Sequence, residues 1–237
     1  MLKLNNITVG YNNKPLFEAA NIHVQEPQLI ALIGRNGMGK STLLRAIAAL
    51  QKPLSGDIII AGEQLTKLTP KQRAENISLV TTENIALPHL KVFDTVALGR
   101  APFSSWSGAL SQNDRDIALQ ALEKVGMGSF ATKTLDSLSD GERQRVMIAR
   151  ALAQKTNLML LDEPTAFLDL PSRLQIMSIL KTLAQENKSV IILSTHDLEL
   201  AKQYADTMWV VNQNKITTGT PSNLEVLEQI TNLITIT

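Results

Sequence analysis

The chain has 237 residues, of which 23 are basic and 22 acidic, giving a formal net charge of +1. A near-neutral chain lacks the basic field that favours nucleic acid, so no nucleic-acid partner is predicted. Cysteine is absent, which excludes disulfide frameworks and thiolate metal sites and suits a reducing compartment. The amino terminus lacks a signal-peptide pattern and no apolar run approaches the roughly 20 residues that span a bilayer, so we expect the chain to reach a membrane only through a partner.

A buried strand leads directly into a glycine-rich turn. Residues 29–33 are continuously apolar, as expected of a strand covered on both faces of a parallel sheet, and they end at Gly34. Helical spacing resumes at Lys40 and stops before Pro53, so the turn lies between a strand and a helix. Two strands are expected earlier in the chain, over residues 2–9 and near residues 23–24.

Helical periodicity dominates from about residue 88 to residue 155, between two regions of alternating strands and helices. The expected helices cover residues 70–75, 92–98, 114–125, 142–154 and 172–185, and the further strands cover residues 58–60, 77–80, 158–161 and 190–193. Strands that alternate with helices imply a parallel sheet with right-handed crossovers. We predict an α/β fold in one domain, 1–237, whose core is formed by residues 1–87 and 156–237 and whose inserted helical lobe spans residues 88–155.

The glycine-rich turn fits the pattern of a phosphate-binding loop, G-x-x-x-x-G-K-[ST]. Its glycines let backbone N–H groups wrap a phosphate chain, and the following helix adds its positive N-terminal end. Lys40 is expected to reach the β- and γ-phosphates of ATP, and the Ser41 hydroxyl to ligate Mg²⁺. A plain turn is the alternative, which the buried strand before it disfavours. The candidate ATP-binding residues are Gly34, Arg35, Asn36, Gly37, Met38, Gly39, Lys40, Ser41 and Thr42.

Two carboxylates, Asp162 and Glu163, follow the predicted strand over residues 158–161. Parallel sheets place their ligands at this carboxyl edge. Asp162 therefore suits the Mg²⁺ shell, and Glu163 is expected to act as general base on a water beyond the γ-phosphate, or to orient it. The alternative of two solvated residues at a strand end is weaker because the phosphate loop is present.

Residues 138–145, Leu-Ser-Asp-Gly-Glu-Arg-Gln-Arg, open a predicted helix. Ser139 and Glu142 have the spacing of a capping box, which by itself accounts for a helix start. A cap leaves Gly141 unexplained, because glycine inside a helix costs about 0.8–1.0 kcal/mol relative to alanine. A glycine suits a close approach to another molecule, so this helix start is also a candidate anion site.

The phosphate loop, residues 138–145, the Leu-Leu-Asp-Glu-Pro run of residues 160–164 and the Ser-Thr-His-Asp run of residues 194–197 together resemble the ATP-binding subunits of ABC transporters in order and spacing. The resemblance covers essentially the whole chain. It implies a P-loop core with a mostly parallel sheet, an N-terminal antiparallel β part and an inserted α-helical lobe. It further implies ATP and Mg²⁺ as cofactors and ATP hydrolysis coupled to transport.

The resemblance also implies that two copies of the chain share two ATP sites. Ser139 and Gly141 match residues that contact the γ-phosphate of ATP held by the other copy. Asp169 matches an acidic residue that acts across the dimer interface.

Two further residues match positions around the nucleotide. Tyr11 matches the aromatic residue that stacks on adenine, although an exposed turn tyrosine is the alternative. His196 matches a histidine that contacts the γ-phosphate, and it joins Lys40 and Glu163 as a catalytic candidate. Its alternative is an ordinary hydrogen-bonded histidine at a strand end.

One position departs from the family pattern. Most members carry a glutamine after the strand over residues 77–80, and Thr82 occupies its place here. A threonine side chain is shorter, which disfavours direct ligation of Mg²⁺ and leaves room for a bridging water.

The segments 97–102, 138–144 and 165–169 are similar to those of importers of iron complexes, meaning siderophores and haem, and of cobalamin. This branch implies two copies beneath transmembrane permease subunits, at the cytoplasmic face of the inner membrane. A periplasmic or lipoprotein substrate-binding protein is then an indirect partner. The helical lobe and residues 81–87 are the expected docking surface for the permease, and ATP binding and hydrolysis would close and reopen the dimer.

A soluble ATPase of the same type that works on DNA or ribosomes is the competing function. Repair-type relatives insert long coiled coils before the 138–145 block, whereas Lys40 and Ser139 are only 99 residues apart here. Translation-type relatives carry two such units per chain. A subunit that binds ATP without hydrolysing it is a third possibility. Glu163 and His196 argue against it, and the missing glutamine argues mildly for it.

Overall fold

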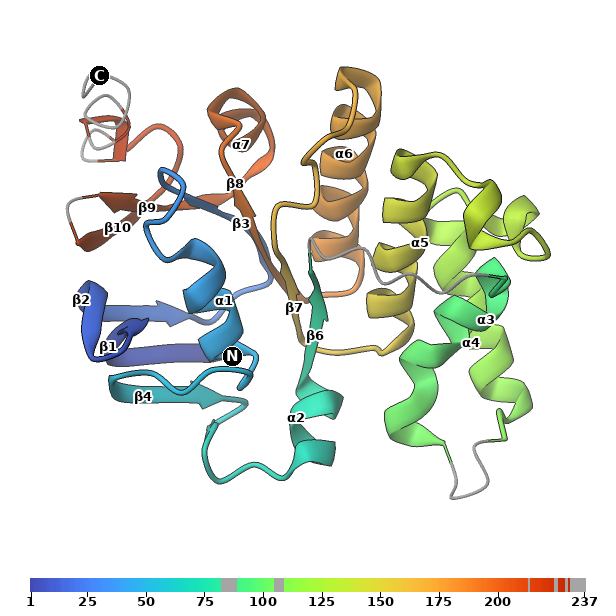
Figure 1. Ribbon diagram of the computed structural model, residues 1–237, viewed down its shortest axis with the longest axis horizontal. Helices are drawn as coiled ribbons and strands as arrows, with labels where there is room; N and C mark the ends of the chain where they lie inside the picture. Colours follow the sequence, from blue (N-terminus) through green and yellow to red (C-terminus); the bar gives the residue numbers. More distant parts are fainter. Residues whose placement is uncertain (82–88, 105–108, 213, 224–225, 229, 231–237) are drawn as a thin grey trace.

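The computed structural model describes residues 1–81, 89–104, 109–212, 214–223, 226–228 and 230 (Figure 1). Thr82 and residues 83–87 of the expected docking loop lie outside the described residues. The strands are β1 (Leu2–Tyr11), β2 (Lys14–Val24), β3 (Gln28–Ile33), β4 (Ser55–Ile60), β5 (Glu63–Gln64), β6 (Ile77–Val80), β7 (Leu158–Leu161), β8 (Val190–Thr195), β9 (Thr207–Asn212) and β10 (Lys215–Gly219). The α-helices are α1 (Lys40–Ile47), α2 (Pro70–Asn76), α3 (Val92–Ala97), α4 (Gln112–Lys124), α5 (Asp140–Ala153), α6 (Leu170–Glu186) and α7 (Leu198–Tyr204).

Two sheets form the β part of the molecule. The larger sheet has the order β10-β9-β3-β8-β7-β6, and all its neighbours pair in parallel except β10 and β9. The smaller sheet has the order β2-β1-β4-β5 and is antiparallel throughout. The predicted α/β fold with a mostly parallel sheet and an antiparallel N-terminal part is therefore confirmed.

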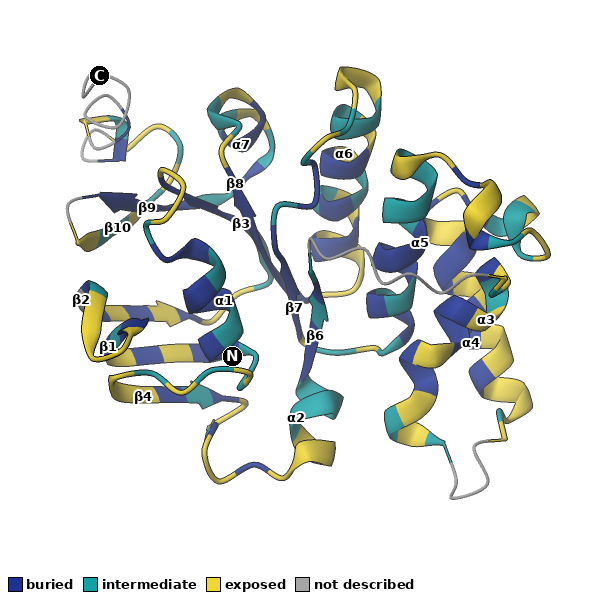
Figure 2. Cartoon of the chain, in the orientation of Figure 1, coloured by how far each residue is buried: buried dark blue, intermediate teal, exposed yellow. Residues whose placement is uncertain are grey.

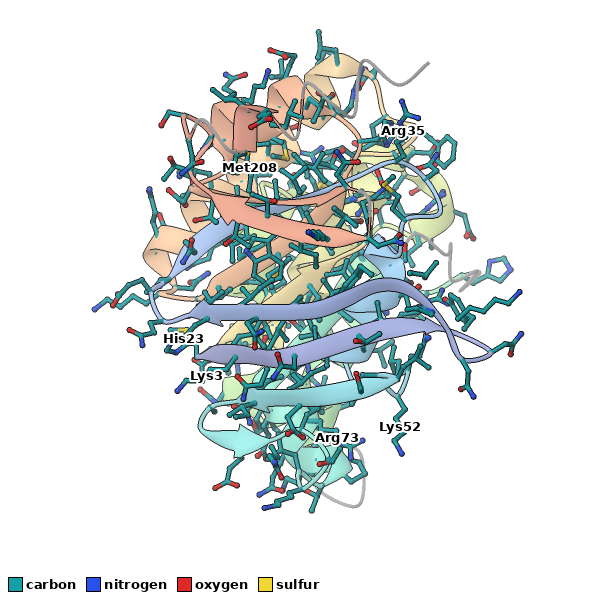
Figure 3. The ribbon with its side chains drawn as sticks, turned by 90° about the vertical axis from the view of Figure 1, so that its left-hand side faces the viewer. Lys3, His23, Arg35, Lys52, Arg73 and Met208 are labelled. Atoms are coloured by element: carbon teal, nitrogen blue, oxygen red, sulfur yellow. The ribbon has the colours of Figure 1, made fainter. Side chains whose placement is uncertain are left out.

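Burial explains why the strands of the two sheets have different hydrophobic patterns in the sequence. Every residue of β7 and β8 is buried, because helices and the second sheet cover both faces (Figure 2). In β1 buried residues are interspersed with exposed ones. Lys3 of β1 and His23 of β2 are exposed cross-strand partners, and Figure 3 shows them on neighbouring strands of the smaller sheet.

The helices α3, α4 and α5 pack together on one side of the larger sheet (Figure 1). At the centre of this packing the Arg100 guanidinium is buried, donating from Nε to Asp114 Oδ1 at 2.9 Å and from Nη1 to the Ala153 carbonyl oxygen at 2.9 Å. One buried side chain therefore joins the 3-10 helix η1 (Leu98–Phe103) to α4 and α5.

Several element bounds differ from the sequence-based expectation. The strand expected near residues 23–24 is the end of an eleven-residue strand, β2, which begins at the exposed Lys14 and Pro15 and has only Leu16 and Phe17 as adjacent large apolar residues in its first half, too short a run to predict its full length. The helix expected over residues 92–98 ends at Ala97 and continues as η1, which contains Pro102. The helix expected from residue 172 begins two residues earlier, because Asp169 caps it and Pro171 fits its first turn.

Candidate functional site

The phosphate loop joins β3 to α1 at the carboxyl edge of the larger sheet. Gly37 and Gly39 have φ angles of 82° and 92°, a region that favours glycine. A Cβ on Gly39 would also lie 3.1 Å from Leu16 Cβ, so both the backbone angle and this close contact disfavour a side chain there. Gly39 is the N-cap of α1 and makes no side-chain hydrogen bond to the helix, which leaves the first-turn N–H groups for an anion.

A pocket of about 360 Å³ opens beside this loop. Its size falls in the range of small-molecule sites. Tyr11 lies at the pocket, is half exposed, and accepts a hydrogen bond from Thr42 Oγ1 at 3.0 Å. The structure therefore places an aromatic ring at the mouth of the predicted ATP site, as stacking on a base requires. The lining residues are Tyr11, Leu16, Asn36, Gly37, Gly39, Lys40, Ser41, Thr42 and Glu163.

The buried Lys40 ammonium turns inward on its own loop and on one carboxylate. Nζ donates to the Gly34 carbonyl oxygen at 2.8 Å and to that of Arg35 at 3.4 Å. It also lies 3.5 Å from Glu163 Oε1. A phosphate entering the loop would meet this ammonium and compete with Glu163 for it.

Asp162 is buried and its Oδ1 accepts two hydroxyl hydrogen bonds. Ser41 Oγ donates at 2.9 Å and Ser194 Oγ at 2.7 Å. Within the described residues no cluster of three or more acidic, histidine or cysteine side chains suited to a metal exists. Mg²⁺ in nucleotide sites takes one or two protein oxygens and completes its shell with phosphates and water. The paired oxygens of Ser41 and Asp162 fit that requirement.

Glu163 has both carboxylate oxygens engaged and a strained backbone. Its Oε2 lies 2.9 Å from His196 Nδ1, while Oε1 faces Lys40. Its φ angle is 47°, a left-handed conformation that costs a non-glycine residue roughly 1–2 kcal/mol. Strain of this kind tends to gather at functional sites. The three residues predicted as catalytic from the sequence are thus brought together.

Ser139 and Gly141 stand apart from this pocket, because α5 and α1 lie on opposite sides of β7 (Figure 1). Ser139 forms a capping box: its Oγ accepts from the Glu142 N–H at 3.3 Å, and its own N–H donates to Glu142 Oε2 at 2.8 Å. The Ser139 N–H and hydroxyl both donate to Glu142 Oε2, and these two hydrogen bonds hold the pKa of the Glu142 carboxyl below its usual value.

Gly141 also has a structural explanation that does not involve a ligand. A Cβ on Gly141 would lie 2.8 Å from Ser172 Oγ and 3.1 Å from Ser172 Cβ, so the close approach of α6 favours a residue without a side chain. No local pattern reveals this contact, because Ser172 lies on a different helix. Glycine here is consistent with a shared ATP site but no longer demands one.

Asp169 is the N-cap of α6, where its Oδ1 accepts from the Ser172 N–H at 3.0 Å. The hydrogen bonds from Ser172 lower the pKa of the Asp169 carboxyl. Because Ser172 also contacts Gly141, the residues expected to face a second copy lie on two adjoining helix starts. Phe167, just before this cap, is fully exposed with φ 62°.

Ser194 is a residue that the sequence reasoning missed. It was quoted within the run of residues 194–197, but only His196 was given a role. The apolar strands over residues 158–161 and 190–193 end one residue before Asp162 and Ser194, and their parallel pairing would have placed the two side by side.

No described helix has the length and apolar character to cross a membrane. A family model described as "ABC transporter" matches residues 17–166. The petrobactin import ATP-binding protein FpuC of Bacillus anthracis is 36% identical over 216 residues, covering 91% of this chain and 79% of FpuC. The achromobactin transport ATP-binding protein CbrD of Dickeya dadantii is 37% identical over 224 residues, covering 94% of this chain and 82% of CbrD.

Solved structures agree with these relatives. An inward-facing ABC transporter of metal-chelate type superposes with a TM-score of 0.86 at 28% identity, covering 98% of this chain and 88% of that one. A dimeric ATP-binding cassette in a post-hydrolysis state, bound to ADP and Pi, has a TM-score of 0.80 at 29% identity, covering 94% of this chain and 100% of its own. Because the family model spans more than half of the chain and the relatives match it almost end to end, the chain belongs to the ABC transporter family, as one of its ATP-binding subunits.

Proposed function

We propose that this subunit hydrolyses ATP to power the import of iron complexes, siderophore or haem, or of cobalamin. The convergence of Lys40, Glu163 and His196 beside the phosphate loop carries the catalytic part of the proposal. The cargo class is supported by FpuC and CbrD, whose names refer to petrobactin and achromobactin.

The roles of the pocket residues follow from their contacts. Lys40 would exchange its loop carbonyls for the β- and γ-phosphate oxygens, which releases Glu163 to orient the attacking water. His196 holds the other oxygen of Glu163 and keeps the carboxylate at the pocket. Ser41 and Asp162 would hold Mg²⁺, which when bound neutralises charge on the phosphate oxygens.

Two copies of the chain would complete each site. Ser139 and Gly141 are not among the residues that line the pocket beside the phosphate loop, so a second copy would present this half-site to bound ATP. The exposed start of α5 has first-turn N–H groups that suit a γ-phosphate. The dimeric cassette among the similar structures supports a two-copy arrangement, in which Asp169 would lie at the interface.

The remaining partners come from the same branch of the family. Transmembrane permease subunits would hold the dimer as a peripheral unit on the cytoplasmic face of the inner membrane, and a substrate-binding protein would deliver cargo from the other side. We place the permease contact on the helical lobe of residues 88–155, which includes α3, α4 and α5 and is inserted into the core of residues 1–87 and 156–237.

Reconstitution tests this function directly. The chain and its permease are placed in proteoliposomes, and ATP-dependent uptake is measured for a ferric siderophore, haem and cobalamin. We expect uptake of one of these cargoes by the wild type and none by a Lys40→Ala control. ATP hydrolysis that needs no permease, together with no uptake of any cargo, would instead favour a soluble ATPase.

A further inference from the structure

One buried hydroxyl connects two neighbouring residues of the proposed site. Ser194 is fully buried, and its Oγ donates to Asp162 Oδ1 at 2.7 Å. The same Oγ accepts from the backbone N–H of Glu163 at 2.8 Å. A serine hydroxyl has a single proton to donate, so its donation to the carboxylate and its acceptance from the amide fix it in one orientation.

The position of Ser194 follows from strand pairing. In the parallel ladder between β7 and β8, Leu161 pairs with Leu193, so the next residues, Asp162 and Ser194, lie opposite each other. Ser194 also pairs with Leu32 of β3, two residues before the phosphate loop. The position of the Ser194 hydroxyl is therefore set by the central strands of the sheet and not by a loop.

The contact with Glu163 supports a strained backbone. Glu163 has φ 47°, and its N–H has Ser194 Oγ as its partner. Loss of this acceptor would leave the N–H without that bond at the point where the chain is strained. The Glu163 carboxylate, which faces Lys40 and His196, would then lose the backbone hydrogen bond that fixes its orientation.

The contact with Asp162 leaves the two oxygens of this carboxylate in different environments. Both hydroxyl donors, Ser41 and Ser194, bind Oδ1, and among the described residues Oδ2 accepts no hydrogen bond. Ser194 thus sets the rotation of the carboxylate and leaves one oxygen for a cation or its water shell.

We propose that Ser194 is a positioning residue that holds the Asp162 carboxylate and the Glu163 backbone together in the arrangement that metal-dependent nucleotide binding and ATP hydrolysis require. The proposal rests on the proposed function for its turnover part. Its metal part concerns binding alone and can be measured without turnover.

The test compares Ser194→Ala and the nearly isosteric Ser194→Cys with Ser194→Thr, which keeps the hydroxyl. Ser78→Ala is the matched control: Ser78 is equally buried in β6, and its hydroxyl lies 2.9 Å from Thr156 Oγ1, before the start of β7 and away from the pocket. Each variant is assayed for steady-state hydrolysis, for thermal unfolding, and for the Mg²⁺ dependence of binding of a fluorescent ATP analogue.

We expect Ser194→Ala and Ser194→Cys to lower kcat by about tenfold or more while KM for ATP stays within about twofold, because the phosphate loop is untouched. The Mg²⁺ concentration that supports half-maximal analogue binding should rise about tenfold or more, the range seen when an outer partner of a ligand is lost. Ser194→Thr should retain most of the turnover. Ser78→Ala should lower thermal stability without changing kcat or the Mg²⁺ dependence.

The proposal is overturned if Ser194→Ala changes kcat and the Mg²⁺ dependence no more than Ser78→Ala does. Equal losses in Ser194→Ala and Ser194→Thr, at equal melting temperatures, would also overturn it, because the hydroxyl would then be irrelevant. If the wild type binds the analogue but hydrolyses no ATP, the proposed function fails, and the Mg²⁺ titration alone decides the role of Ser194.

Discussion

Glu163 is the residue at which the contacts of the pocket meet. Its carboxylate lies between the Lys40 ammonium and the His196 imidazole, and its backbone N–H is held by Ser194. The side chain is mostly buried, whereas the imidazole of His196 is 64% exposed. A bound phosphate would compete with Glu163 for the Lys40 ammonium. Nucleotide entry would therefore free the Glu163 carboxylate to orient the attacking water.

Replacing Glu163 by Gln tests this assignment at the residue scale. The amide keeps the shape of the side chain but cannot accept a proton, so we expect turnover to fall by about a hundredfold or more. ATP binding should persist, and a nucleotide-bound dimer should accumulate on size-exclusion chromatography with ATP. A Glu186→Gln control changes an exposed carboxylate paired with Lys124. Undiminished hydrolysis would remove Glu163 as the base.

At the scale of elements, a capping box headed by serine begins both α4 and α5, but only the start of α5 is proposed to contact ATP. Ser139 starts α5 and Ser111 starts α4, each with a capping box closed by the third residue of its helix. If α5 needed only a cap, the two serines would be interchangeable in their effect on function.

The comparison of Ser139→Ala with Ser111→Ala separates a shared ATP site from a simple cap. Both variants should lose about 1 kcal/mol of stability, the usual effect of a lost N-cap. Only Ser139→Ala should lower turnover, by about tenfold, with the ATP affinity of the monomer within about twofold of wild type, since its contact is made in the other copy's site. Turnover is measured with saturating ATP and affinity by fluorescence titration. Equal losses of turnover and affinity in Ser139→Ala would point back to a cap.

The capping box of α5 also predicts a pH dependence. The hydrogen bonds from Ser139 hold the pKa of the Glu142 carboxyl below its ordinary value. A depressed carboxyl stabilises the folded state above its unfolded pKa, and this contribution is lost as the pH falls through the folded pKa. The difference in free energy of unfolding between wild type and Glu142→Gln should therefore be constant near neutral pH and shrink below pH 4.5.

Urea unfolding from pH 7 to about 3 measures this difference, provided both proteins stay folded at the lowest pH. Lys133 and Arg145 also act on Glu142, so the titration is repeated at high salt, where their effect is screened and that of the hydrogen bonds persists. A difference that stays constant through the acid range would contradict the assignment.

At the scale of the whole molecule, the candidate residues divide into two groups. The phosphate loop, Asp162, Glu163 and His196 lie at the carboxyl edge of the parallel sheet, where such sheets bind ligands. Ser139, Gly141 and Asp169 lie on the starts of α5 and α6. If a second copy supplies Ser139, Gly141 and Asp169 to the ATP site, the two groups need not come together within one chain.

The buried guanidinium of Arg100 links η1 to α4 and α5. We expect Arg100→Met to lower the melting temperature well beyond the effect of Lys71→Met, because the former removes the cation beside the buried Asp114 and leaves Asp114 Oδ1 and the Ala153 carbonyl without the hydrogen bonds from Arg100. Lys71 forms only an exposed pair with Glu75 at 3.9 Å and serves as control. Thermal unfolding followed by circular dichroism measures both. Equal melting temperatures would show that the buried ion pair contributes nothing to the assembly of these helices.

Much of the fold was predictable because its signals are local. The apolar runs at β3, β7 and β8, the glycine-rich loop and the capping box of α5 each fit within about ten residues, so periodicity and spacing reveal them. The extent of β2 was not predictable in the same way. Its first half pairs with β1 through the backbone, and backbone pairing leaves little trace in side-chain pattern.

The sequence by itself determined the phosphate loop, the carboxylates at the end of a buried strand and the resemblance to ATP-binding subunits, since each is written in adjacent residues. Only the tertiary structure decided that the approach of Ser172 favours glycine at position 141, and that Ser194 joins Asp162 to Glu163. The physical reason is the range of the interaction. These contacts join residues about thirty positions apart, and the packing of one helix on another or the register of two parallel strands brings them together.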